Sequence, residues 1–168
     1  MKQTKLRGDL LELLHNFPLL ASIGAILFAQ FIKVPITFFV TKKIDWSLLT
    51  STGGMPSSHS AAVTALSTGV ALETGFNSPI FAVSAIFAII TMFDATGVRR
   101  QAGEQAIVLN KLVIDFNKFI NEAKGWQNKP EQDKRKELKE LLGHKPIEVF
   151  FGGLTGIVLT LLINMLIK

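Results

Sequence analysis

The chain contains no cysteine and few charged side chains. Of its 168 residues, 18% are Asp, Glu, Lys or Arg, whereas 48% are hydrophobic. The lack of cysteine excludes a disulfide scaffold, thiol catalysis and a cysteine-ligated metal. A chain this apolar is not intrinsically disordered. The formal net charge of +5 bears on membrane topology rather than on the fold.

Charged residues are missing altogether from four long stretches: Leu13–Ile32, Trp46–Leu72, Thr74–Phe93 and Val149–Ile167. Each has 19 to 27 residues, and a helix needs about 20 mostly apolar residues to cross the hydrocarbon core of a bilayer. These stretches exclude a soluble globule, a soluble nucleic-acid-binding domain and a secreted enzyme. We therefore predict an integral, multi-pass protein of the cell membrane.

We expect residues 1–168 to form a single membrane domain: an all-α bundle of about four transmembrane helices plus an amphipathic surface helix. The spans are placed at about residues 17–40, 58–75, 79–94 and 148–167, after a short amphipathic lead-in helix within residues 1–16. Lys33 interrupts the first span, and an ionisable residue inside a span is a candidate for function. The alternative is that Lys33 extends to the membrane interface.

The polar segment at residues 97–144 separates the last two spans. In it Leu109, Leu112, Val113 and Phe116 recur at three- and four-residue intervals, which predicts an amphipathic helix. We expect this helix to lie on the membrane or to cap the bundle, and we expect a second, charge-rich helix at 131–142. An even number of crossings separates this segment from the loop at 41–59, so both segments face the same side.

One candidate motif is the run from Gly53 to Ala61, directly before a predicted helix. It places Ser57, Ser58 and His59 after two glycines and a proline. Serine suits the N-cap, and the exposed N–H groups at a helix N-terminus attract anions. The run therefore predicts a phosphate-binding turn with His59 as proton donor; a capped helix with an incidental histidine is the alternative.

A second motif joins His144 and Glu148 at the entrance to the last span. The two residues are four apart, so in a helix they share a face. There the carboxylate can hold one imidazole nitrogen and leave the other free to attack or to accept a proton.

Arginines follow the third span. Arg99 and Arg100 suit the recognition of phosphate oxygens or lipid headgroups, and they can also pair with Asp94 and Glu104. All three motifs are expected at one membrane surface.

Together these motifs resemble a known superfamily. Pro56-Ser57-Ser58-His59 is similar to the Pro-Ser-Gly-His signature of the type 2 phosphatidic acid phosphatases and the related vanadium haloperoxidases. His144-x-x-x-Glu148 is similar to their final His-x-x-x-Asp element. With the run from Asp94 to Arg100, the chain resembles the small divergent membrane branch of that superfamily over about residues 20–160.

The resemblance implies a phosphatase that hydrolyses a lipid phosphomonoester or diphosphate without a metal or other cofactor. It implies that His144 attacks phosphorus, that Glu148 orients it and that His59 is the general acid. The groups it implies for phosphate binding are Ser57, Ser58, Arg99, Arg100, Lys33 and Lys139.

The chain differs from the parent family at two cationic positions. Val40 and Thr41 stand where the first motif has Arg-Pro, and Leu138, beside Lys139, stands where the last motif has arginine. We expect Arg99 and Arg100 to supply the missing charge from another segment.

Two other functions are consistent with the sequence. One is a metal-dependent lipid phosphotransferase built on Asp94 and Glu104, and the other is a non-enzymatic membrane protein that binds a lipid phosphate. The small-xxx-small pattern of Gly152 and Gly156 allows close helix packing, within the chain or in a homo-oligomer.

We predict that the motif-bearing side is cytoplasmic and that both termini lie outside. The motif side carries 13 Lys and Arg residues and the other side four, and loops rich in Lys and Arg tend to remain cytoplasmic. Single cysteines at Ser51, Gln127 and Gln3 test this in intact cells with a membrane-impermeant thiol reagent. Labelling at position 3 alone is expected; labelling at 51 and 127 without position 3 would reverse the assignment.

Overall fold

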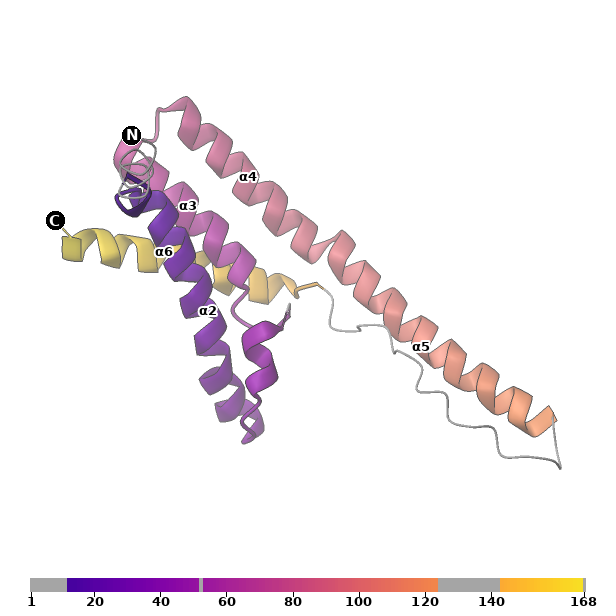
Figure 1. Cartoon of the computed structure of the whole chain (residues 1–168). Coiled ribbons are helices and arrows are strands. Elements are labelled where there is room, and N and C mark those ends of the chain that lie inside the picture. Colours follow the sequence, from indigo (N-terminus) through magenta and orange to yellow (C-terminus); the bar gives the residue numbers. More distant parts are fainter. Residues whose placement is uncertain (1–11, 52, 124–142, 168) are drawn as a thin grey trace, which may run out of the picture.

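The computed structural model describes residues 12–51, 53–123 and 143–167. Every regular element in these ranges is a helix (Figure 1): α2 Phe17–Thr41, the short 3-10 helix η1 Trp46–Thr50, α3 Ser58–Thr74, α4 Pro79–Thr96, α5 Val98–Ala123 and α6 Pro146–Ile167. The prediction of an all-α membrane protein is confirmed. The charge-rich helix expected at 131–142 lies outside the described residues, as does most of the lead-in segment.

Local signals set the helix ends. Asn16, Ser57 and Ser78 are N-cap residues, and their side chains accept hydrogen bonds from first-turn N–H groups of α2, α3 and α4. Proline occupies the first turn of α2 and of α4, where its missing N–H has no cost. As a result, α2, α3, α4 and α6 begin and end within two residues of the bounds expected for the four spans.

Within the described residues, three helical stretches are long and apolar enough to cross a membrane: Phe17–Thr41, Pro79–Ile120 and Pro146–Ile167. The chain is thus a multi-pass membrane protein. The 17-residue α3 is shorter, yet it lies at the centre of the bundle and packs against α2, α4 and α6. Its buried side chains are mostly small, among them Ser60, Ala61, Thr64, Ala65 and Ser67. Small side chains allow the neighbouring helices to approach α3 closely.

The glycines of α6 form its contact with α3. A Cβ atom at Gly152 would overlap the carbonyl oxygen of Ser57, and one at Gly156 would overlap that of Ala61. The pattern that we considered for self-association therefore serves packing inside the chain. In this fold, α3 occupies the surface that a second copy would need at these two glycines.

Helix α5 continues α4 after a break at Gly97, and Figure 1 shows it running away from α2, α3 and α6. It has the expected apolar face, with Leu109, Leu112 and Phe116 on one side of the helix. These side chains are exposed, so no described segment covers that face. Of the two placements that we expected for this helix, capping the bundle is therefore wrong.

We expect Gly156→Ala to lower the thermal unfolding midpoint of the protein in detergent. The added methyl group must displace the α3 backbone, and overpacking of this kind costs about 1–3 kcal/mol. Gly24→Ala is the matched control, because no atom lies within 4 Å of the added Cβ. It should leave the midpoint unchanged or raise it, since alanine is the better helix former. Thermal unfolding of both variants is measured by circular dichroism. Equal midpoints would contradict the close α3–α6 contact.

Candidate active site

The N-terminus of α3 is anchored to the N-terminus of α6 through Ser57. Its backbone N–H donates to the Glu148 carbonyl oxygen at 3.0 Å. Its hydroxyl oxygen accepts from the Ser60 N–H at 3.3 Å and from the Ser60 hydroxyl at 3.1 Å. The Ser57 side chain is fully buried and acts as the helix cap. Ser58, the first residue of α3, is also buried beside this junction.

His59 and His144 come from distant parts of the sequence and lie against each other. Their ring centroids are 5.8 Å apart and the rings meet edge to face. The backbone N–H of His144 donates to the Ala95 carbonyl oxygen at 3.0 Å, which fixes the residue to the end of α4. Gly143 has φ +92°, and a Cβ there would overlap the Arg100 backbone. Only glycine fits this turn without strain, and the turn delivers His144 to His59.

The imidazole of His144 is enclosed by the protein. The residue is 3% exposed, and its Nε2 atom is buried with no hydrogen-bond partner among the described residues. Burial, followed by the positive charges of His59, Lys33 and Arg99, lowers the pKa of His144 to about 4. At neutral pH the ring is therefore uncharged, and it carries a lone pair that is available to a nucleophile or a base.

Glu148 does not contact the His144 ring through a hydrogen bond in this structure. Its Oε2 accepts from the Lys145 N–H at 3.0 Å, which is the return contact of a capping box at the start of α6. Its charge also acts on Lys33. The expected role of Glu148 as the partner of His144 would require the carboxylate to leave the Lys145 N–H.

Lys33 lies inside the protein rather than at the membrane interface. The residue is 1% exposed, and a Cβ at Gly54 would lie 3.8 Å from its Cδ, so the side chain runs beside the turn before α3. Its ammonium donates to the Oε1 atom of Gln30. The interfacial alternative for Lys33 is therefore wrong. Sequence reasoning missed Gln30, although its spacing of three residues from Lys33 places both on one helix face.

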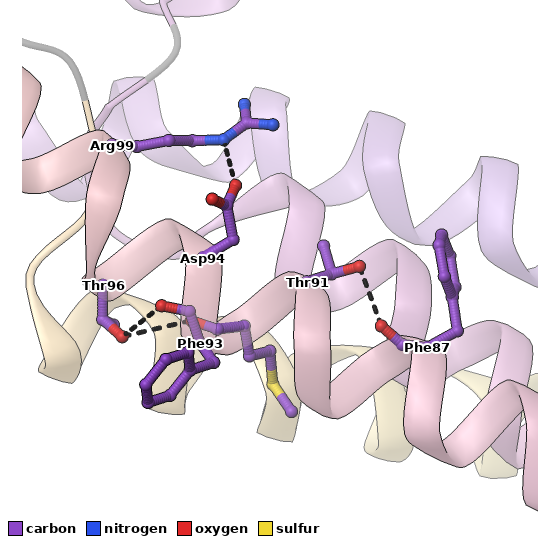
Figure 2. Close-up of polar contacts among 7 residues, drawn as sticks. Phe87, Thr91, Phe93, Asp94, Thr96 and Arg99 are labelled. Carbon is purple, nitrogen blue, oxygen red and sulfur yellow. Dashed lines mark hydrogen bonds and ion pairs between the residues drawn. The ribbon is translucent and has the colours of Figure 1, made fainter.

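The two arginines lie at the junction of α4 and α5. The Nε atom of Arg99 is 2.6 Å from Oδ2 of Asp94 (Figure 2), and the Nε atom of Arg100 is 3.0 Å from Oε1 of Glu104. Both pairs are partly exposed to solvent. The positive charge of Arg99 acts on the histidine pair.

The carboxylates of Asp94 and Glu104 form ion pairs with the two arginines. In the part of the chain that the structure describes, no group of three or more His, Asp or Glu side chains could share a metal ion. Asp94 and Glu104, which the metal-dependent alternative needs, each pair with a guanidinium group instead. Lys139 lies outside the described residues.

The sequence of this chain is similar to those of known proteins. A family model described as the "Divergent PAP2 family" matches residues 14–159. The chain is 75% identical over 153 residues to a protein of Bacillus subtilis (strain 168) named "Uncharacterized membrane protein YuiD". The alignment covers 91% of this chain and 97% of that relative. No solved structure matches.

We predict that the His144 ring titrates near pH 4 in the folded protein, which NMR of the histidine side chains in micelles can measure. Removing a nearby cation stabilises the imidazolium form, so Arg99→Gln should move the midpoint up toward the ordinary value of 6.5. Arg100→Gln is the matched control and should leave it unchanged. Because the folded state binds this proton more weakly, folding stability should fall from about pH 6.5 to about pH 4. A wild-type midpoint near 6.5 would contradict the enclosed site.

Proposed function

This chain belongs to the divergent PAP2 family, and from that premise we propose that it is a membrane phosphatase that hydrolyses a lipid phosphomonoester or diphosphate. The reaction passes through a phosphohistidine and uses no metal ion. The observation that carries the proposal is the contact of His59 with the buried, uncharged His144. The centroids of the two rings are 5.8 Å apart. Two cations, Lys33 and Arg99, act on this pair.

In the first step, Nε2 of His144 attacks phosphorus and the P–O bond to the lipid breaks. His59, in its imidazolium form, donates its proton to the leaving oxygen. In the second step, water attacks the phosphohistidine and the P–N bond breaks, while His59 takes a proton from the water. Inorganic phosphate leaves and both histidines return to their starting states. The negative charge of the bound phosphate favours the imidazolium form of His59 that the first step needs.

Charge on the transferring phosphoryl group is balanced by fixed cations. Lys33 is buried and its positive charge acts on His59 and His144, and a helix N-terminus such as that of α3 attracts anions. Arg99 uses Nε for Asp94, which leaves its terminal NH₂ groups for phosphate oxygens. In this proposal, Ser58, Arg100 and Lys139 add phosphate contacts. Positioned positive charge of this kind accounts for most of the barrier reduction in phosphoryl transfer.

A groove between α3, α4 and α6 supports a lipid as the substrate. It has a volume of about 380 Å³ and is lined mainly by apolar residues, including Leu72, Phe81, Ile89, Ile157 and Leu161. His59 is in the first turn of α3, and Arg99 and His144 lie just after α4 and just before α6, whereas the groove is lined by residues farther along these three helices. In this proposal, the hydrocarbon chain extends from the phosphate into the bundle toward the groove, which is in the size range of ligand pockets.

A non-enzymatic lipid-phosphate-binding protein is the second candidate. The observation in its favour is the hydrogen bond from the Lys145 N–H to Glu148, because Glu148 is then not the orienting partner of His144. The two candidates differ in a single measurement, the release of inorganic phosphate by purified protein across a panel of lipid phosphates. A water-soluble phosphate ester belongs in the panel as the substrate without a hydrocarbon chain.

We expect His144→Ala to reduce phosphate release by more than about 10³-fold, because a nucleophile cannot be replaced by binding alone. Glu148→Gln should leave a small residual activity, since an orienting group contributes only part of the rate. His15→Ala is the control, as this exposed histidine lies before α2, and it should retain full activity. Unchanged turnover by a folded His144→Ala variant would exclude the phosphohistidine mechanism. Binding of lipid phosphates without any release would favour the second candidate.

A further inference from the structure

Gln30 lies one turn before Lys33 on α2, and its side chain joins two parts of the site. Its Nε2 donates to the Leu49 carbonyl oxygen at 2.9 Å and to the Ser51 carbonyl oxygen at 3.4 Å. Both carbonyls belong to the segment between α2 and α3. Gln30 therefore ties α2 to the loop that leads into the α3 N-terminus.

These two bonds set the direction of the amide. An NH₂ group can only donate, and a carbonyl oxygen can only accept. With Nε2 turned to the two loop carbonyls, Oε1 of Gln30 must face the opposite way, where it accepts from the ammonium of Lys33. The loop thus determines, through Gln30, where the ammonium group is held.

The partner of Lys33 is uncharged, and this matters because the lysine is 1% exposed. Neither ion pair found among the described residues includes Lys33, and Glu148 acts on it only through its longer-range charge. A buried cation without a counter-ion is costly, and a bound anion removes that cost. An ammonium has three N–H donors, so one bond to Gln30 leaves two for an anion.

We propose that Gln30 is a positioning residue for phosphate binding. It holds the Lys33 ammonium with a neutral acceptor, so that the positive charge stays available to the phosphate group. This inference rests on the function proposed above. A glutamate at the same position would have nearly the same shape, yet it would neutralise Lys33 and repel an anion.

The test compares Gln30→Glu with Gln30→Met, which has a similar length but no charge and no hydrogen-bonding amide. The dissociation constant of inorganic phosphate is measured on the full chain in nanodiscs, together with KM and kcat. Gln105→Glu adds the same charge on the exposed face of α5 and is the matched control. Thermal unfolding midpoints of all variants identify any loss of folding. If Gln30→Glu does not fold, wild-type phosphate affinity in folded Gln30→Met still overturns the inference.

We expect the dissociation constant to rise about threefold in Gln30→Met and about tenfold or more in Gln30→Glu, with no change in Gln105→Glu. A purely structural role of Gln30 in anchoring the loop predicts equal effects for Met and Glu, because both lose the two loop bonds. Equal effects of the two substitutions, or wild-type phosphate affinity in a folded Gln30 variant, would overturn the inference. The proposed function would still stand in that case if the wild-type protein turns over its substrate. A wild-type protein that neither binds nor releases phosphate would overturn both.

Discussion

The close approach of α6 to α3 is the contact on which the rest of the arrangement depends. Gly152 and Gly156 leave no side chain between the two backbones, so the Ser57 N–H reaches the Glu148 carbonyl oxygen. That bond joins the first turns of α3 and α6, and with them the segments that carry His59 and His144. A larger residue at Gly152 or Gly156 would overlap the α3 backbone and separate the helix ends, and the two rings with them.

The helix junction concentrates positive charge around an uncharged ring. Lys33 and Arg99 act on the histidine pair, whereas the nearby carboxylates are directed elsewhere. Asp94 pairs with Arg99 at the α4–α5 junction (Figure 2), and Glu148 binds the Lys145 N–H. Because burial weakens screening by water, cations in such a site favour an anionic ligand more strongly than exposed ones do. After burial, which is the main cause of the low pKa of His144, Lys33 and Arg99 lower it further, and the same two cations would hold the phosphate in the function proposed above.

Much of this fold follows from local sequence signals. Ser57 caps α3, as serine in its motif indicated, and the count of crossings placed His59 and His144 on one side. The sequence signals did not show which of several possible contacts a polar side chain makes. The hydroxyl oxygen of Ser57 accepts from Ser60, in addition to the phosphate contact expected of this residue. Glu148 is four residues after His144 and three after Lys145, and its carboxylate accepts from the Lys145 N–H rather than holding the His144 ring.

The sequence by itself determined that this chain is a multi-pass helical membrane protein, where α2, α3, α4 and α6 begin and end, and which motifs share a membrane face. Hydrophobic length and helix capping are local properties, so they can be read along the chain. Only the tertiary structure decided that Lys33 is buried against Gln30, that the Gly152 and Gly156 face is covered by α3, and that α5 leaves the bundle. Each of these depends on which distant segment supplies the nearest partner, and that choice is made by packing between helices rather than by spacing within one.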